Sequence, residues 1–212
     1  MSSNDRGAFN WKALAQTCGM TPTPGQAQRL DELAHWLAER AFPLGFTNYP
    51  SAESLLEHHV APVLALFCLL PLPPSGRALD LGAGSGALGL TLSILAPDLK
   101  VLLADRRRRS AQFIGLTVAR LGIHNAEAMQ VDAEGLAKTY PEAFDLVCFR
   151  ALAPAPDVFG LVKPLPRAGG SVVAWHQSSD DAFLHPPPGW ERVATLATSL
   201  PGLSVSQFHR AP

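Results

Sequence analysis

Three glycines in a segment of five residues form the part of this sequence that is best suited to bind a nucleotide. The segment Leu79-Asp80-Leu81-Gly82-Ala83-Gly84-Ser85-Gly86 ends an apolar run and precedes Ala87-Leu88-Gly89-Leu90, which has the composition of a helix start. A strand that ends in a glycine-rich turn and opens a helix is the layout of nucleotide-binding βα units. Glycine permits positive φ angles in the turn, and its missing Cβ lets a ligand approach the backbone. The residues that we expect to contact a cofactor here are Gly82, Gly84, Gly86 and Leu88.

The spacing of the glycines leaves two classes of cofactor open. The first two glycines and Ala87 satisfy the pattern of NAD sites, whereas three glycines at alternate positions are typical of enzymes that use S-adenosylmethionine (SAM). Asp80 favours SAM, because a carboxylate two residues before the first glycine would face the positively charged methionine end rather than a pyrophosphate. Asp105 ends the expected second strand, about 20 residues beyond the turn, and suits a ribose diol. Asp132 follows the third strand and is placed to accept a hydrogen bond from an adenine amino group. The alternative is a glycine turn with unrelated surface aspartates.

Four consecutive arginines form the strongest charge cluster of the chain: Arg106, Arg107, Arg108 and Arg109. At the start of a helix they oppose the helix dipole, so local structure does not favour them there. They follow the second strand, at the carboxyl end of the expected sheet, which is the usual ligand side. We therefore expect them to contact phosphate groups, the alternative being a solvated helix start.

The candidate catalytic residues, Arg150 and His176, follow the fourth and fifth expected strands. SAM enzymes place groups that face the methyl acceptor after the fourth strand, and the bland neighbours of Arg150 in residues 151–154 give it no evident packing role. His176 enters the same region, either as a donor to phosphate or as a plain surface residue. His58 and His59 lie on an expected helix, where a surface or capping role is favoured. The sequence indicates no metal site.

The elements that must position these groups alternate between strands and helices from residue 75 onward. Such alternation predicts an α/β fold with a doubly wound, mostly parallel sheet of seven strands. The expected strands cover residues 77–81, 100–104, 128–131, 144–149, 171–175, 191–197 and 204–208, and the expected helices cover residues 87–96, 107–121 and 154–165. Residues 75–212 thus form the expected cofactor-binding domain.

Residues 1–74 are expected to form a helical subdomain and a linker. Apolar periodicity predicts one helix near Trp11, a second that begins at Pro24 after an N-cap at Thr23, and a third after an N-cap at Ser51. Pro62 is expected to kink or restart the third helix, and a proline-rich connector follows it.

The composition indicates a globular protein of the cytoplasm. The chain has 212 residues, 47% of them hydrophobic and 17% charged, and its net charge of −1 gives no overall attraction to nucleic acid. Cys18, Cys68 and Cys148 lie far apart without metal-ligand spacing, so we expect reduced core thiols. Residues 1–10 lack the apolar region of a signal peptide, and the apolar run 60–72 is too short to span a bilayer. We expect a monomer that does not enter a membrane.

A longer set of motifs surrounds the candidate residues. Its members are Asp80-Leu81-Gly82-Ala83-Gly84-Ser85-Gly86, Gly89, Pro97, Leu103-Ala104-Asp105, Arg109, Phe113, Ala133-Glu134 and Arg150-Ala151-Leu152-Ala153. This combination resembles the bacterial GidB family of small-subunit ribosomal RNA guanine-N7 methyltransferases. The likeness runs from about Thr47 to Gly170, and the arginine-alanine pair after the fourth strand is its most specific part. The resemblance implies a class I methyltransferase fold with SAM as cofactor, and 16S ribosomal RNA or the small ribosomal subunit as partner. It adds Ala133, Glu134 and Arg150 to the residues expected at the cofactor.

The sequence departs from the family pattern at several positions. Thr47 and His59 fall where the family has an Asn-Leu-Thr turn and a histidine. The departures are Gly45 for the asparagine of the turn, Pro62 for the acidic residue after the histidine, His176 for a lysine, and Ser204 and Val205 for a late arginine-histidine pair. Two alternatives therefore stay open: a SAM-dependent methyltransferase of another substrate, and a homologue that binds SAM or RNA without catalysis. A nicotinamide dehydrogenase fits the glycines only.

Guanine N7 carries a free lone pair, so methyl transfer to it needs no general base. Catalysis would come from holding N7 in line with the methyl group and from excluding water. Arg150, the family active-site cation that is clearly kept, is expected to bind guanine O6 or a nearby phosphate and to leave N7 free.

Overall fold

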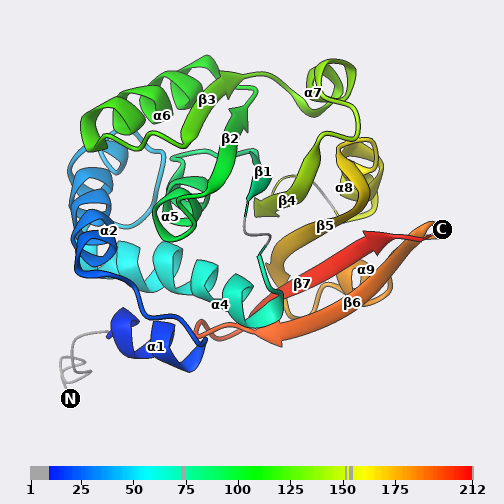
Figure 1. The fold of residues 1–212 in the computed structure, drawn as a ribbon, viewed down its shortest axis with the longest axis horizontal. Coiled ribbons are helices and arrows are strands. Elements are labelled where there is room, and N and C mark those ends of the chain that lie inside the picture. Colours follow the sequence, from blue (N-terminus) through cyan, green and yellow to red (C-terminus); the bar gives the residue numbers. More distant parts are fainter. Residues whose placement is uncertain (1–9, 73–74, 151, 153–154, 212) are drawn as a thin grey trace.

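A seven-stranded sheet forms the centre of the computed structural model, which describes residues 10–72, 75–150, 152 and 155–211 (Figure 1). The strand order is β3-β2-β1-β4-β5-β7-β6. The pairs among β1 to β5 are parallel, whereas β7 pairs antiparallel with both β5 and β6. The strands are β1 (Gly76–Leu81), β2 (Leu99–Asp105), β3 (Ala126–Gln130), β4 (Phe144–Arg150), β5 (Pro166–Gln177), β6 (Trp190–Ala197) and β7 (Leu203–Arg210). The expected mostly parallel sheet is confirmed, but β5 is longer at both ends than the predicted 171–175, so His176 lies within the strand and not after it.

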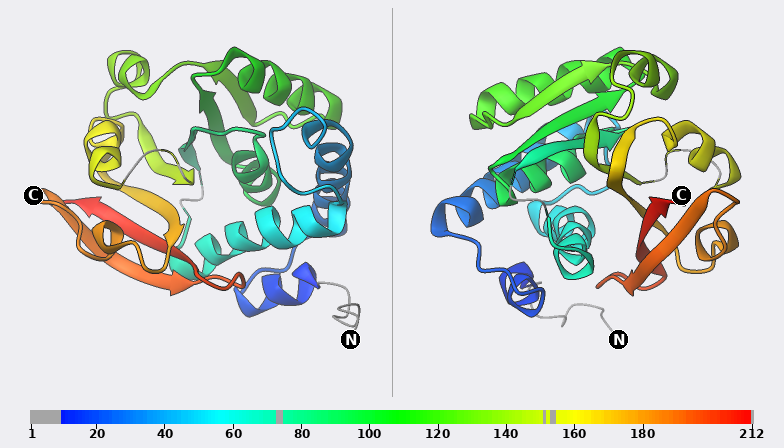
Figure 2. Two further views of the ribbon diagram at one scale, coloured as in Figure 1. Left: turned by 180° about the vertical axis from the view of Figure 1, so that it is seen from behind. Right: turned by 45° about the vertical axis from the view of Figure 1, so that its right-hand side comes forward.

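Helices cover both faces of the sheet because neighbouring strand residues point to opposite sides. Ala78 and Leu103 belong to the hydrophobic cluster under α5 (Ala87–Leu95) and α6 (Arg108–Leu121). Leu79 and Val147 face the opposite cluster, under α7 (Ala133–Thr139), α8 (Ala155–Val162) and α9 (Asp181–Leu184) (Figure 2). The sheet is therefore doubly wound, as predicted. The short helices α7 and α9 were not predicted, because each buries a single residue, Leu136 and Phe183, and so shows no apolar period.

The N-terminal helices pack on the same face of the sheet as α5 and α6. They are α1 (Trp11–Thr17), α2 (Pro24–Trp36), the π-helical turn η1 (Leu37–Ala41), α3 (Ala52–Leu55), the π-helical turn η2 (Leu56–Val60) and α4 (Ala61–Leu69). Thr23 and Ser51 cap α2 and α3 as predicted, each with a reciprocal capping box. Leu30 and Leu64 lie in one hydrophobic cluster with Val101 of the sheet. The boundary expected at residue 74 thus separates two stretches of sequence that share a core.

The helical stretch Ala52–Leu69 is the one described segment that is long and apolar enough to cross a membrane, by length and composition alone. Nearly half of it, 44%, is buried within the structure, and α4 packs against α5, β6 and β7. A core helix passes the same test, so this segment is weak evidence for a membrane span. The expectation of a buried helix at residues 60–72 agrees with this packing.

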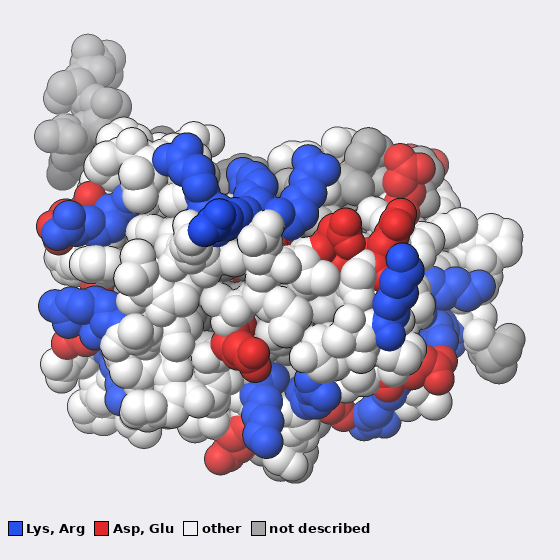
Figure 3. Space-filling model, turned by 90° about the horizontal axis from the view of Figure 1, so that it is seen from above, with Lys and Arg blue, Asp and Glu red and all other residues white. Residues whose placement is uncertain are grey.

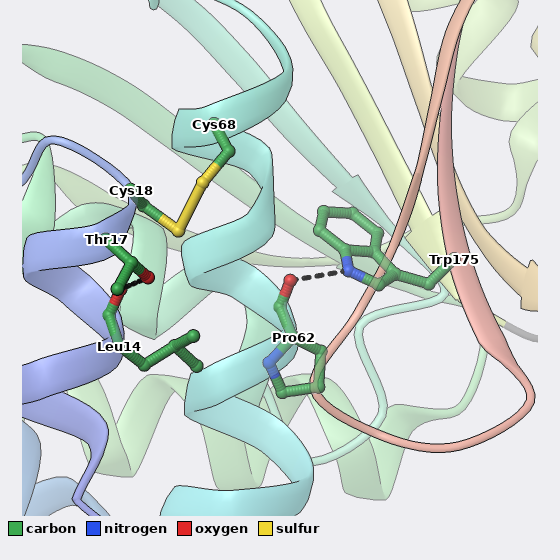
Figure 4. The surroundings of a disulfide bond; sticks show 6 residues. All are labelled: Leu14, Thr17, Cys18, Pro62, Cys68 and Trp175. Carbon is green, nitrogen blue, oxygen red and sulfur yellow. Dashed lines mark hydrogen bonds between the residues drawn. A yellow bond between two sulfur atoms is a disulfide. The ribbon is translucent and has the colours of Figure 1, made fainter.

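A disulfide between Cys18 and Cys68 joins the end of α1 to the end of α4 (Figure 4). The prediction that these two residues are separate reduced thiols is therefore wrong. Cys148, in contrast, is a buried free thiol of β4, as expected. Near the same helix, the indole Nε1 of Trp175 donates to the carbonyl oxygen of Pro62 at 2.8 Å, which ties α4 to β5 (Figure 4).

Candidate active site

The glycine turn after β1 has the backbone that the sequence predicted. Gly82, Gly84 and Gly86 have φ angles of 76°, 61° and 80°, which other residues rarely adopt. The amides of Gly82 and Ala83 both donate to the carbonyl oxygen of Ala104, at 2.8 and 3.0 Å, so β2 holds the turn in place. A Cβ on Gly82 would lie 2.6 Å from the side chain of Leu152. The φ angle therefore requires glycine at position 82, and a side chain there would also have to displace the end of Leu152.

Asp80 lies inside the protein directly behind the turn. Its Oδ2 accepts a hydrogen bond from the amide of Gly89 at 2.8 Å, and this bond fixes α5 against β1. Burial raises the pKa of Asp80 to about 7, while the Gly89 hydrogen bond counteracts part of the shift. Its expected contact with the methionine end of SAM stays a prediction, because the observed contact is with the helix.

Asp105 at the end of β2 closes the glycine turn from the other side. Its Oδ2 accepts from the amide of Gly84 at 2.9 Å, and its Oδ1 accepts from the amide of Arg107 at 2.9 Å. The Arg107 guanidinium also donates to both oxygens, at 3.2 Å each. Burial alone would raise the pKa of Asp105, but the hydrogen bonds from Arg107 and Gly84 lower it overall, so the carboxylate is ionised.

Asp132, the third predicted cofactor carboxylate, lies beyond the end of β3, the strand next to β2. Asp132 follows β3 and caps α7, its Oδ1 accepting from the amide of Gly135 at 2.8 Å. Strand β3 covers residues 126–130 and ends one residue earlier than expected. Ala133 and Leu88 are half-buried, and Glu134 is exposed. The tips of β1, β2 and β3 thus bring together the predicted cofactor residues at the carboxyl edge of the sheet, and their contacts with SAM stay predictions.

Arg150 ends β4, next to β1, and its side chain is held by the N-terminal helices. Its Nη1 donates to the carbonyl oxygen of His58 at 2.9 Å. Residue 62 would normally donate to that carbonyl in an α-helix, four residues on, but Pro62 has no N–H. The proline therefore leaves an acceptor that Arg150 uses. Burial lowers the pKa of Arg150, yet a guanidinium stays protonated at neutral pH.

Two histidines and their partners pack around this contact. His59 Nε2 lies 3.1 Å from Thr47 Oγ1, and Tyr49 stacks on the His58 ring with centroids 4.3 Å apart. Burial, followed by the charges of Arg150 and His58, lowers the pKa of His59 to about 3, so its ring is neutral. The expected surface or capping role of His58 and His59 does not describe this cluster. The sequence signal that was overlooked is the proline four residues after His58.

His176 is buried, with both ring nitrogens engaged. Its Nδ1 lies 2.8 Å from the carbonyl oxygen of Gln177, its Nε2 lies 2.8 Å from Ser206 Oγ, and its ring stacks on Phe183. Burial lowers the pKa of His176, so the ring is neutral, with Nδ1 donating and Nε2 accepting. A plain surface position is excluded. The catalytic role of His176 stays a prediction, and its contacts favour a part in holding the cavity wall.

A cavity of about 280 Å³ brings Arg150 and His176 together where β4 and β5 end. Its lining residues are Phe149, Arg150, Leu152, Trp175, His176, Gln177, Asp180, Phe183 and Leu203. Two larger cavities lie elsewhere. One of 750 Å³ is formed mainly by α2 and the end of α6, and one of 390 Å³ lies where β1 and β2 begin. Ligands of open α/β sheets bind at the carboxyl ends of strands, so the smallest cavity is the candidate acceptor site.

The four arginines lie on the same edge of the molecule, and all are exposed. Figure 3 views the protein from the side on which β2 and β3 end in Figure 1, and it shows Lys and Arg side chains gathered there with acidic side chains beside them. Arg107 is tied to Asp105, and the guanidinium of Arg109 lies 5.9 Å from the ring centroid of Phe46. The structure thus supports a basic surface next to the glycine turn, whereas its contact with RNA stays a prediction.

Comparison with known proteins assigns the chain to a family. The model described as "rRNA small subunit methyltransferase G" of the GidB family matches residues 26–185. The chain belongs to the GidB family. This confirms the resemblance seen in the sequence and extends it to the N-terminal helices, since the match begins before Thr47. GidB proteins are SAM-dependent methyltransferases, so the expected enzyme class and cofactor are those of the family.

Relatives of this GidB chain carry the same description. Ribosomal RNA small subunit methyltransferase G of Moorella thermoacetica is 31% identical over 82% of this chain and 73% of its own length. The protein of that name from Acidothermus cellulolyticus is 33% identical over 66% of this chain and 60% of its own length. The Thermotoga neapolitana protein is 31% identical, and the match spans 61% of it. The chain thus spans less than two thirds of the length of two of these relatives.

Solved structures support the fold alone. The mitomycin 7-O-methyltransferase MmcR superposes with a TM-score of 0.61 at 15% identity, covering 82% of this chain and 60% of that chain. MtNAS in complex with MTA and tNA superposes with a TM-score of 0.59 at 17% identity, covering 95% of this chain and 74% of that chain. These likenesses confirm the predicted class I methyltransferase architecture of this GidB chain.

Proposed function

We propose that this chain transfers the methyl group of SAM to N7 of a guanine in 16S ribosomal RNA. The observation that carries the proposal is the continuity of the site along one sheet edge in a GidB protein. The glycine turn follows β1, Asp105 ends β2 and Asp132 follows β3, and the Arg150 cavity adjoins them at β4 and β5. A cofactor half and an acceptor half therefore lie side by side.

The residues present fit SAM as the cofactor. The positive-φ glycines leave no side chain between the backbone of the turn and a ligand, and Asp105 is an ionised acceptor suited to ribose hydroxyls. Asp132 would receive the adenine amino group, with Leu88, Ala133 and Glu134 around it. When bound, SAM supplies a methyl group on a positively charged sulfur, and the chain supplies its position.

For this reaction the chain needs only to bind the guanine and to orient it toward the methyl group. Guanine N7 has no proton to remove, so methyl transfer to it needs no general base. The polar residues that line the cavity therefore need only bind the acceptor: Arg150 carries a positive charge, and the His176 ring is held in place by Gln177 and Ser206. Arg150 would bind guanine O6 or a nearby phosphate and leave N7 free. The apolar residues of the cavity wall, among them Leu152 and Leu203, would help to exclude water and favour in-line attack.

The partner follows from the same site. Arg106, Arg108 and Arg109 would hold RNA phosphates, and Arg107 would join them when it leaves Asp105. We place the protein in the cytoplasm as a monomer that acts on ribosomal RNA or on the small ribosomal subunit, without membrane contact.

The test is transfer of radiolabelled methyl from SAM to small-subunit ribosomal RNA that lacks its N7 marks. We expect label in guanine N7 that is lost with Asp105→Ala, which also weakens binding of S-adenosylhomocysteine. Arg150→Ala should lower transfer by about 100-fold while leaving that binding within about twofold. An equal loss of both in Arg150→Ala would place Arg150 in the cofactor site. Cofactor binding without label on RNA or on intact subunits would favour another methyl acceptor or a protein without catalysis.

A further inference from the structure

The cavity at the ends of β4 and β5 has the size and walls of a site for one planar base. Its volume of about 280 Å³ is near the lower end of the range of small-ligand sites, roughly 300–1,000 Å³. Phe149, Trp175 and Phe183 are among its lining residues, and all three are almost fully buried. Trp175 belongs to the hydrophobic cluster on one face of the sheet, and Phe149 and Phe183 belong to the cluster on the other face. A base that is turned out of an RNA strand binds in a pocket lined by apolar and aromatic side chains.

One positive and one negative side chain line this cavity. Arg150 is fixed from behind by the carbonyl oxygen of His58 at 2.9 Å. Asp180 precedes α9 and is half-buried, and no side-chain hydrogen bond or ion pair of Asp180 is found within the described ranges. Arg150 and Asp180 do not pair with each other in the described part of the chain. Each charge is thus available to a ligand in the cavity.

This arrangement matches the polarity of guanine. Guanine presents acceptors at O6 and N7, and donors at N1–H and N2–H₂ on the adjoining edge. A carboxylate has two acceptor oxygens and no donor, so it suits two neighbouring N–H groups. Adenine presents an amino group next to an unprotonated N1, so a carboxylate would gain one contact and meet one repulsion.

We propose that Asp180 selects guanine as the methyl acceptor by accepting hydrogen bonds from N1–H and N2–H₂, while Arg150 holds the O6 side. The proposal rests on the proposed function, and it adds a specificity-determining residue to the site. With both edges held, N7 is left facing the cofactor half of the sheet edge. Asp180 acts on the choice of base, not on the bonds that form or break.

The experiment compares two variants of neighbouring aspartates. Asp180→Asn keeps the shape of the side chain but replaces one acceptor by a donor. Asp181→Asn is the matched control, because Asp181 is outside the cavity and its side chain is 86% exposed. Calorimetric titration of the full chain, saturated with S-adenosylhomocysteine, would use GMP, IMP and AMP as probes, since IMP lacks only the N2 amino group of GMP. Melting temperatures of the variants would verify folding.

We expect the wild type and Asp181→Asn to bind GMP about tenfold more tightly than IMP, and more tightly than AMP. In Asp180→Asn the ratio of GMP to IMP affinity should fall to about twofold or less. An unchanged ratio in Asp180→Asn, or a wild type that binds AMP as well as GMP or binds none of the three, would overturn the proposal. Methyl transfer to ribosomal RNA is measured in parallel. If transfer occurs but the ratio of GMP to IMP affinity does not depend on Asp180, the role of Asp180 alone is refuted. If the ratio depends on Asp180 but no transfer occurs, the proposed function is refuted.

Discussion

Replacing Pro62 with alanine should make the protein more stable and less active, because both effects act through one carbonyl group. The carbonyl oxygen of His58 lies four residues before Pro62 and accepts a hydrogen bond from Arg150 Nη1. An alanine restores the N–H that an α-helix directs to this carbonyl. The helix would then compete with Arg150 for its anchor.

The structure sets the size of each effect. Proline in a helix interior is about 3 kcal/mol less favourable than alanine, but the π-helical turn η2 already accommodates Pro62, so we expect a gain of about 1 kcal/mol. A hydrogen bond to a charged group contributes about 1.5–3 kcal/mol, and the half-buried position of Arg150 favours the lower end. A loss of about 1.5 kcal/mol corresponds to about a tenfold fall in kcat/KM for methyl transfer.

The assay pairs urea unfolding with methyl-transfer kinetics on the same preparations. Pro24→Ala is the control, since Pro24 starts α2 where its missing N–H has no helical acceptor, and it should leave kcat/KM unchanged. In an Arg150→Ala background, Pro62→Ala should have no further effect on transfer. Unchanged kcat/KM in the more stable variant, or an equal effect in both backgrounds, would refute the link between Pro62 and Arg150.

Three further predictions concern other contacts. Arg107→Ala should tighten S-adenosylhomocysteine binding about two- to fivefold in low-salt calorimetry, because it frees Asp105 from its ion pair with Arg107. The expected gain is small because the Arg107 side chain is 59% exposed. Weaker binding, or the same gain in Arg106→Ala, would contradict this prediction. The Cys18–Cys68 disulfide has a sequence separation of 50, so it should contribute about 4 kcal/mol to the free energy of unfolding by restricting the unfolded chain. Reduction and the double serine variant should lower the urea midpoint by the same amount. Coincident unfolding curves for the oxidised and reduced protein would disprove this contribution. Burial raises the pKa of Asp80 to about 7, compared with the ordinary value of 3.8. Between about pH 4 and pH 7 the folded protein therefore keeps a proton on Asp80 that the unfolded chain has released. The free energy of unfolding consequently falls as the pH rises through this range. Asp80→Asn should therefore lose less stability than the wild type between about pH 5 and pH 8 in urea titrations, and equal losses would exclude this effect of Asp80.

The fold was predictable because its signals are local. The turn at Gly82, Gly84 and Gly86 needs positive φ angles that glycine supplies, and each parallel strand is a short apolar run next to a helical period. Helix α7 was not predicted because Leu136 is its one buried residue, whereas α1, of the same length, shows an apolar repeat. The π-helical turn before Pro62 escaped as well, because the pattern of apolar residues does not distinguish a wide turn from a kink.

A site residue could be predicted only where a reactive side chain lies at a sequence position with a known place in the fold. Asp105 was found because a carboxylate at a strand tip lies a known number of residues after a glycine turn. The pairing of Cys18 with Cys68 was missed, because it depends on how α1 meets α4. Asp180 was missed because its proposed role depends on the cavity at the ends of β4 and β5, which Asp180 lines together with Arg150.

The anchor of Arg150 shows why motif reasoning stops at this point. Such reasoning reads side chains, but the partner of Arg150 is a backbone carbonyl 92 residues away that is available because a proline lacks a donor. Pro62 therefore leaves free the carbonyl group that holds Arg150 in position. Pro62 and Arg150 thus act as one structural feature, and losing either should affect the acceptor half of the site while sparing the cofactor half.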